Sequence, residues 1–567
     1  MGQLKVRMGA MLLLAASAVY AQDSRGKLQG RVTDSSDAVL IGAAVTLHNN
    51  NTGVGNTSVT RPDGQYLFDF VTPGTYTITV EMTGFSKFVQ KNILVQARAD
   101  VTVDARLQPG STRESVTVES SPVAVQFNTS TMGLTIDTKM TNNLPIIHRN
   151  PFLLAALNPA TVVRSTTEQS PFHHWAASQL DVGGNTSTKN DIILDGSPSM
   201  TTQKSSYTPP MDAVSEVNLQ QNAIDAEFGH SAGGVLSVSM KSGTNEYRGT
   251  GYYLGRNPAL NALADRITRR SNLTRQHVWG GTFGGPIVKN KVFTFASYEA
   301  WRTIDPRSTL STLPTAAERN GDFSNSLNTT GSLRSIYDPY TTAVNGNTVT
   351  RTPFAGNVIP ASRIDPTSKV VIGDLWIANG VGSGPTGLNN FLAGYGNRYR
   401  YWNFSDRVDW NVSDKLKVFG RFNTFRTFTA QDDFTGGSRA LPVDGSKRHS
   451  RSFSGDAVYA LNASTVLNIR GAYNAIVDSF GVPSATLKEA DLARIWPSNA
   501  WYTPYLKELP DIYYPGITVT QGSNTVMGRT GYWFQEPNSY NLESKMSKNI
   551  GKHYVKFGGE YRRENVI

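Results

Sequence analysis

The sequence of 567 residues contains no cysteine. This absence excludes a disulfide framework, thiolate metal sites and cysteine nucleophiles within the chain, and also a lipid anchor attached through cysteine. Runs of one charge are absent as well. The net charge is +10, yet no five or six basic residues follow one another. Positive charge this dispersed favours a mildly basic surface or lumen and argues against a nucleic-acid partner.

Long apolar runs are also missing. The longest spans residues 8–19, follows Lys5 and Arg7, and leads to a small residue at Ala21. A charged start, a short apolar stretch and a small residue predict a signal peptide over residues 1–21, and therefore export. A helix needs about 20 apolar residues to cross a bilayer. If the protein enters a membrane, it must do so as a β-barrel.

The composition indicates a mainly β protein. Only 39% of the residues are hydrophobic, whereas glycine, tyrosine and phenylalanine are plentiful at 51, 23 and 24 residues. Few segments show an apolar helical stripe. This profile suits strands joined by many turns, and the length predicts two to four domains.

Residues 22–108 predict a small β-sandwich. Apolar and polar residues alternate at 45–48 and 76–81, and turn signals lie at 61–64 and 72–74. Short strands at this spacing imply roughly seven strands in two sheets. The strings GRVTDSSDAVLIGAAVTLHNNNTG and TRPDGQYLFDFVTPGTYTITVEMTGF resemble the carboxypeptidase-regulatory-like, transthyretin-like domain. The resemblance implies a non-catalytic domain.

Residues 109–126 predict a linker rich in serine, threonine and valine. Within it, a short segment resembles a TonB box, the extended stretch that TonB pairs with as an added strand. The segment is Glu114, Ser115, Val116, Thr117 and Val118. A β-prone strand can offer its backbone groups to a partner. A plain linker is the alternative interpretation.

Residues 127–245 resemble the TonB-receptor plug of the Oar-like type, which implies an α+β domain. The matching strings are LPIIHRNPFLLAALNPATV, DVGGNTSTKNDIILDGSPSM and VSEVNLQQNAIDAEFGHSAGGVLSVSMKSGTNEYRGTGYYLGRNPALNA. Ala160 and His148 depart from the usual pattern. The resemblance assigns the plug motif to Asp195, Gly196, Glu227, Phe228, Gly229, Gly233, Gly234, Lys241 and Gly243. Its glycines suit strands packed closely inside a barrel.

Residues 246–567 predict part of a large antiparallel transmembrane β-barrel. In 402–412, 416–423 and 467–474 one parity is apolar and the other carries charges of both signs, as a lumen would. Aromatic residues near the strand ends predict an interfacial girdle of Trp301, Tyr399, Tyr401, Trp402, Phe425 and Phe428.

Stretches 303–398 and 479–535 predict long extracellular loops. The segment 283–302 resembles an early hairpin of Oar-like barrels. About nine strands are expected, whereas transporters of this kind use about 22. A C-terminally truncated sequence would account for the difference.

Several motifs suggest other chemistry. Residues 229–233 fit the nucleophile elbow G-x-S-x-G around Ser231, but a strand rather than a helix is expected next. Residues 382–387 fit G-x-G-x-x-G, yet Pro385 interrupts the motif and predicts a loop. Adjacent His173 and His174 point to opposite sides of an extended segment, so they do not easily share a metal ion.

The carboxylates of Asp191 and Asp195 flank a predicted strand. They could bind calcium or cap turns, and their spacing does not decide between the two. The sequence therefore indicates no catalytic residues, no metal site and no cofactor.

The resemblance implies a TonB-dependent receptor in the outer membrane of a Gram-negative bacterium, with its N-terminal domain and plug facing the periplasm. The expected partners are TonB with its inner-membrane energising complex, outer-membrane lipids and a large substrate, such as an oligosaccharide or peptide. Protein export or adhesion is the main alternative. A secreted serine hydrolase using Ser231 and a soluble multi-sandwich adhesin are alternatives from other classes.

Overall fold

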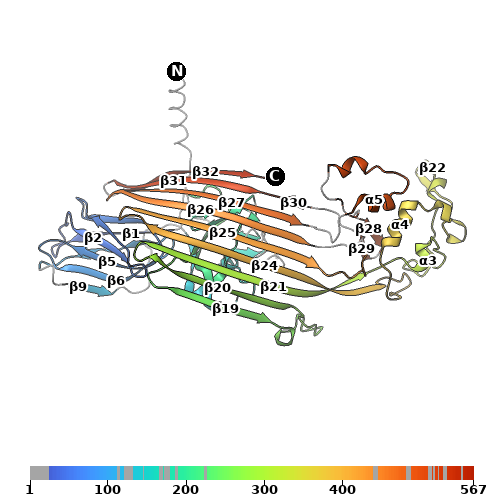
Figure 1. Cartoon of the computed structure of the whole chain (residues 1–567), viewed down its shortest axis with the longest axis horizontal. Helices are drawn as coiled ribbons and strands as arrows, with labels where there is room; N and C mark the ends of the chain where they lie inside the picture. Colours follow the sequence, from blue (N-terminus) through green and yellow to red (C-terminus); the bar gives the residue numbers. More distant parts are fainter. Residues whose placement is uncertain are drawn as a thin grey trace, which may run out of the picture.

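The computed structural model shows a β-sandwich, a small domain within residues 132–245 and a large curved sheet (Figure 1). The small domain coincides with the predicted plug, and we refer to it by that name. It describes residues 25–110, 115–119, 132–144, 146–164, 170–171, 179–184, 189–202, 204–221, 227–438, 445–480, 487–508, 512, 514, 517–521, 523–527, 533–550 and 553–566. Within these residues, no helix is long and apolar enough to cross a bilayer.

The sandwich consists of two sheets. One contains β1 (Gly26–Thr33), β4 (Gln65–Val71), β7 (Asp100–Thr102) and β8 (Ala105–Arg106). The other has the order β3-β2-β5-β6-β9, with β2 (Ala44–Asn49), β3 (Gly55–Val59), β5 (Gly74–Glu81), β6 (Lys87–Val95) and β9 (Ser115–Glu119). Alternate residues of these strands, such as Leu28, Val45 and Ile78, face each other and form the core.

The plug is built on a five-stranded mixed sheet of order β10-β17-β18-β13-β14. Its strands are β10 (Met132–Asp137), β17 (Val214–Gln221), β18 (Gly234–Met240), β13 (Asp191–Leu194) and β14 (Ser197–Pro198). Shorter elements surround it: α2 (Thr138–Asn143), η1 (Pro151–Leu157), β11 (Thr161–Val163), β12 (Leu180–Val182), β15 (Met200–Thr201), β16 (Lys204–Ser205) and η2 (Met211–Ala213). Every residue of β18 is buried, so this strand lies at the centre of the plug.

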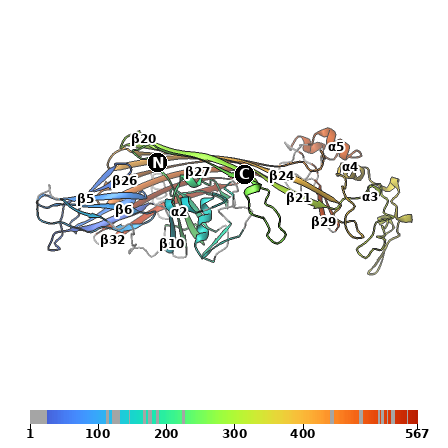
Figure 2. The ribbon, with the colours of Figure 1, turned by 90° about the horizontal axis from the view of Figure 1, so that it is seen from below.

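The large sheet has nine strands in sequence order, each antiparallel to the next, and β30 (Trp533–Gln535) pairs with β27 beside them. The nine are β19 (Arg248–Arg256), β20 (Arg275–Val288), β21 (Val292–Ser311), β24 (Phe391–Asn411), β25 (Leu416–Gln431), β26 (Ser446–Asn462), β27 (Thr465–Phe480), β31 (Asn538–Ile550) and β32 (His553–Asn565). Figure 2 shows the sheet arching over the plug, which lies against its concave face.

The two faces of this sheet reverse the usual pattern of a soluble protein. Along β27, Ile469 is 47% exposed, whereas Asn468 and Arg470 on either side are at most 1% exposed. Along β31, Leu542 is exposed between buried Asn541 and Glu543. Apolar side chains therefore face outward and polar ones face the plug, as in a membrane barrel. The predicted mainly β architecture with a polar inner face is confirmed.

Short turns join the strands at the end near the sandwich, and long excursions leave the opposite end (Figure 1). The excursions contain α3 (Ala316–Arg319), η4 (Pro339–Thr341), β22 (Ala343–Asn345), β23 (Thr348–Thr350), α4 (Pro366–Asp374), α5 (Glu489–Ile495), η7 (Thr503–Leu506), β28 (Ile517–Gln521) and β29 (Ser523–Met527). The excursion between β21 and β24 is shorter than the predicted loop 303–398, because β21 pairs with β24 without interruption as far as Ser311 and Phe391.

The aromatic girdle prediction is wrong for three of its residues. Trp301, Tyr401 and Phe425 are each 2% exposed and belong to the core that the sheet shares with the plug. Tyr401 and Phe425 have the same parity as Asn403 and Asn423, which are also buried. Strand alternation therefore turns these rings inward, where the plug provides an apolar surface for them.

Candidate functional site

The candidate site is the interface between the plug and the concave face of the large sheet. Charged residues on the inward parity of the strands meet charged residues of the plug. A buried charge is costly unless it is paired and hydrogen-bonded, so these contacts hold the plug in one position. The plug contributes Asp191, Asp195, Lys204 and Glu227.

Asp195 lies at the tight turn after β13 and pairs with two arginines of the sheet. Its carboxylate is 2.6 Å from Nη1 of Arg421 and 3.0 Å from Nη1 of Arg407, and it accepts the Met240 backbone N–H at 2.8 Å. Burial raises the pKa of Asp195, but the two guanidinium groups and the amide outweigh burial, so its net pKa is lowered. Asp195 is therefore an ionised anchor of the plug.

Gly196 follows Asp195 with a φ of +82°. A Cβ at this position would lie 2.7 Å from Nη2 of Arg470. Arg470 instead uses this space to donate from Nη1 to the Gly196 carbonyl oxygen at 2.8 Å. The glycine is required both for its left-handed backbone and for the close approach of the guanidinium.

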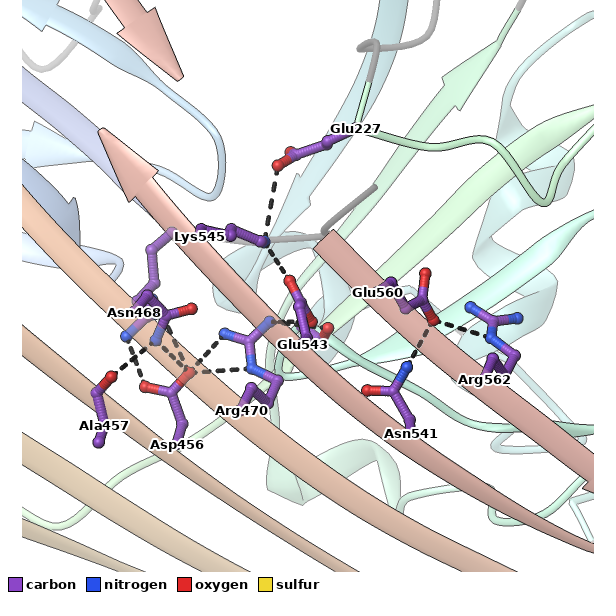
Figure 3. A network of polar contacts seen from close by, with 12 residues as sticks. Glu227, Asp456, Ala457, Asn468, Arg470, Asn541, Glu543, Lys545, Glu560 and Arg562 are labelled. Carbon is purple, nitrogen blue, oxygen red and sulfur yellow. Dashed lines mark hydrogen bonds and ion pairs between the residues drawn. The ribbon is translucent and has the colours of Figure 1, made fainter. Parts of the chain in front are cut away.

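Arg470 belongs to a row of side chains with alternating charge (Figure 3). Its guanidinium is 2.9 Å from Asp456 and 3.5 Å from Glu543. Lys545 lies 2.5 Å from Glu543 and 3.6 Å from Glu227 of the plug. This row of ion pairs therefore links strands β26, β27 and β31 to the plug.

Two further ion pairs hold the side of the plug next to the last strands. Arg562 of β32 lies 3.0 Å from Asp191. Lys204 lies 2.9 Å from Asp478, which Arg448 contacts at 2.6 Å on its other oxygen. Asp191 and Asp195 thus serve as partners for arginine, and the calcium alternative that the sequence left open has no support from their contacts.

The other plug motif residues have structural positions. Phe228 is buried beneath the Arg98 guanidinium, and Lys241 donates to the Asp212 carbonyl oxygen at 2.7 Å. A Cβ at Gly234 would lie 2.5 Å from Val182, and one at Gly243 would lie 2.8 Å from the Gly285 carbonyl oxygen of β20. Gly233 is buried and Gly229 is exposed.

The sandwich contacts both the plug and the sheet. The Ala97 backbone N–H donates to both carboxylate oxygens of Glu216 at 2.9 Å, and Arg98 lies 2.7 Å from Glu227. Arg25 contacts Asp456 at 2.9 Å, and Tyr554 of β32 donates to Asp69 at 2.7 Å. The turn around Ala97 is therefore a docking point on the plug.

Glu216, at this contact, makes the stability of the folded protein sensitive to pH. Burial raises its pKa to about 7, and Asp137 adds to the rise, while the Ala97 amide opposes it. Because the folded pKa lies above the ordinary value of 4.5, this group's contribution to the stability of the folded state is fully present below pH 4.5 and is lost as pH rises through about 7. The full contribution of Glu216 to the free energy of unfolding is at most about 3 kcal/mol.

We expect Glu216→Gln to flatten this dependence, since an amide keeps an acceptor oxygen and stays neutral. The measurement is the thermal midpoint of the protein in detergent at pH 5 and pH 8. The wild type should lose more stability over that interval than the variant. An equal loss in both proteins would contradict the assignment to Glu216.

The TonB-box candidate lies partly within the sandwich. Glu114 falls outside the described residues, whereas Ser115, Val116, Thr117 and Val118 belong to β9, which pairs in parallel with β6. The preceding residues are held by a hydrogen bond from the Ser86 N–H to the Gln108 carbonyl oxygen at 2.8 Å. The composition of 109–126, rich in serine, threonine and valine, did not reveal that residues 115–119 complete a sheet.

The structure does not support the alternative motifs that it describes. Ser231 donates to the Gly234 carbonyl oxygen at 2.7 Å and is followed by strand β18, so it lacks the strand-to-helix turn of a nucleophile elbow. Residues 382–387 form a loop closed by a bridge between Ser383 and Leu388, as predicted. His173 and His174 lie outside the described residues. Within the described ranges, no three potential ligands gather into a metal site.

Comparison with known families and proteins gives two matches to family models and one curated relative. Residues 239–567 match the outer membrane beta barrel domain, and residues 27–108 match the carboxypeptidase regulatory-like domain. The TonB-dependent transporter Oar of Myxococcus xanthus is 26% identical over 296 residues, which cover 50% of this chain and 27% of that protein.

Among solved structures, the outer membrane transporter YddB from Escherichia coli is similar with a TM-score of 0.46 and 12% identity, covering 76% of this chain and 48% of that one. The siderophore receptor PirA from Acinetobacter baumannii is similar with a TM-score of 0.42 and 11% identity, covering 76% and 48%. The chain thus spans about half the length of these structures and about a quarter of the Myxococcus relative.

Proposed function

This chain belongs to the outer-membrane β-barrel family, and from its similarity to the TonB-dependent transporter Oar we propose that it takes part in TonB-dependent movement of a large substrate across the outer membrane. The observation that carries the proposal is the plug, held against the concave face of the sheet by buried ion pairs. A seated plug obstructs the path along this face. Movement of substrate then requires work on the plug.

The source of that work follows from the location. The outer membrane has no ATP and no ion gradient of its own, so force must come from the inner membrane through the periplasm. TonB is the partner we propose, and the handle is the segment 114–118 just before the plug. We accordingly propose the division into a sandwich at 22–108, a linker at 109–126 whose residues 115–119 pair with the sandwich as β9, a plug at 127–245 and a barrel segment at 246–567.

The substrate class we propose is an oligosaccharide or peptide, and the direction is import. The long excursions form an apolar cluster that includes Trp376 and Leu492 and also Phe391, the first residue of β24. On its surface, Trp501 and Tyr505 are about half exposed with ring centroids 6.2 Å apart. Exposed aromatic faces of this kind suit stacking on sugar rings or aromatic side chains. Export or adhesion of a protein is the second candidate.

The test uses labelled pools of oligosaccharides and of peptides too large for passive diffusion. Their accumulation is measured in cells that contain or lack this protein, each with and without TonB. Import predicts that at least one pool accumulates only when both are present. Accumulation that needs the protein but not TonB would contradict energised transport, and accumulation in no pool would favour the export or adhesion alternative.

A further inference from the structure

Strand β9 forms one edge of the sandwich, at its outer rim (Figure 1). It pairs in parallel with β6 over five residues, from Lys87 opposite Ser115 to Lys91 opposite Glu119. A short distance before β9, residues 109 and 110 are held beside the turn that precedes β6, since Pro109 bridges Phe85 and the Gly110 N–H donates to the Gly84 carbonyl oxygen at 3.2 Å. The candidate handle is thus an ordered strand of this domain.

A strand in a sheet has two edges, and β6 occupies only one edge of β9. Among the strands that the structure describes, none pairs with the other edge. Edge strands are commonly protected by proline, bulges or charged residues pointing inward. Strand β9 contains no proline, and its one charged residue is Glu119 at the end of the strand. Its pairing with β6 has no bulge, and the side chain of Thr117 is exposed. With respect to the described residues, this edge is therefore open to an added strand.

We propose that the sandwich presents residues 115–119 as a preformed edge strand, and that an extended strand of TonB adds to its open edge while β6 stays paired on the other. The inference rests on the proposed function, and it goes further by identifying the sandwich as the docking platform. The strand order of the sheet would then be β3-β2-β5-β6-β9 followed by the strand of TonB.

Energetics favour addition over displacement. A free linker would have to be ordered when the partner binds, whereas β9 is already ordered by β6. Displacement would also break the backbone pairing of β6 with β9 before any new pairing formed. Addition leaves that pairing intact and uses backbone groups that face away from β6.

Because the sandwich holds β9, a force that TonB applies to β9 has a defined path to the plug. A load on β9 passes through β6 into the body of the sandwich. The sandwich contacts the plug through Ala97 on Glu216 and through Arg98 on Glu227. The handle is in this way connected to the plug through packed structure as well as through the chain that follows residue 119.

The test is a disulfide that prevents β9 from leaving β6. Val89 and Thr117 are paired in the register, Val89 is half-buried and Thr117 is exposed, so the double variant Val89→Cys with Thr117→Cys joins neighbouring positions. The chain has no other cysteine, so no competing pair forms within it. The full protein is purified from outer membranes, and its affinity for the purified periplasmic domain of TonB is measured before and after reduction.

We expect the oxidised protein to bind TonB within about twofold of its reduced form and of the two single-cysteine variants. Binding that appears only after reduction would overturn the inference, because β9 would then have to leave β6. Failure of the disulfide to form in the folded protein would overturn it as well. A wild-type protein that does not bind TonB at all would instead refute the proposed function, so the two failures are distinguishable.

Discussion

Asp195→Asn is expected to lower the free energy of unfolding by about 3–5 kcal/mol, the usual cost of removing one partner from a buried ion pair. The variant keeps the size of the side chain but removes the charge that faces Arg421 and Arg407. Arg407 retains Asp409 at 2.7 Å. Arg421 has no second carboxylate among the ion pairs of the described residues, so its buried charge loses its counter-ion.

The measurement is the thermal midpoint in detergent, with Asp432→Asn as the matched control. Asp432 pairs with Arg398 at an exposed site, where water screens the interaction, so its replacement should leave the midpoint unchanged. The double variant Asp195→Asn with Arg421→Gln should recover part of the loss, since it removes the uncompensated cation. Equal midpoints for Asp195→Asn and Asp432→Asn would show that the plug is not anchored at this site.

The alternation of polar and apolar residues was enough to predict the sheet. In 402–412 and 467–474 the two parities differ so clearly that strand, membrane face and lumen face all follow from them. The same pattern predicted charges in the lumen. It could not tell which charges meet, because Arg421 and Asp195 are 226 positions apart and no local spacing relates them.

The alternation along the strand also indicated which way the aromatic side chains point, and the girdle prediction did not use this. Tyr401 stands two residues before Asn403 and therefore shares its inward face, but its position near a strand end suggested a lipid-facing girdle. Parity along the strand decides which way a ring points, and the apolar surface of the plug decides that an inward ring is stable. Only the second condition requires the tertiary structure.

The pairing of β9 with β6 could not be predicted for a different reason. Five residues with a Val-Thr-Val centre suit an edge strand and a free linker equally, and their partner in a parallel pair lies 28 positions earlier, as in Lys87 opposite Ser115. The register comes from the packing of the sandwich, which fixes Gln108 and Pro109 beside β6.

Val116→Pro is the second prediction with a large expected effect. Proline removes the backbone N–H of residue 116, so β9 loses a donor to the neighbour on that side, and its fixed φ disturbs the regular strand geometry that pairing on the other side needs. We expect at least about tenfold weaker binding of TonB, which corresponds to about 1.4 kcal/mol or more. Val116→Ala keeps the backbone donor and should bind TonB nearly as well as the wild type, which makes it the matched control.

The central claim is that TonB couples to this protein through the segment before the plug. The most direct measurement is the amount of TonB that co-purifies with the protein from cells carrying the wild type, Val116→Ala or Val116→Pro at equal outer-membrane levels. TonB should accompany the first two proteins and be lost from the third. Wild-type protein that carries no TonB, or Val116→Pro protein that carries as much as the wild type, would contradict the claim.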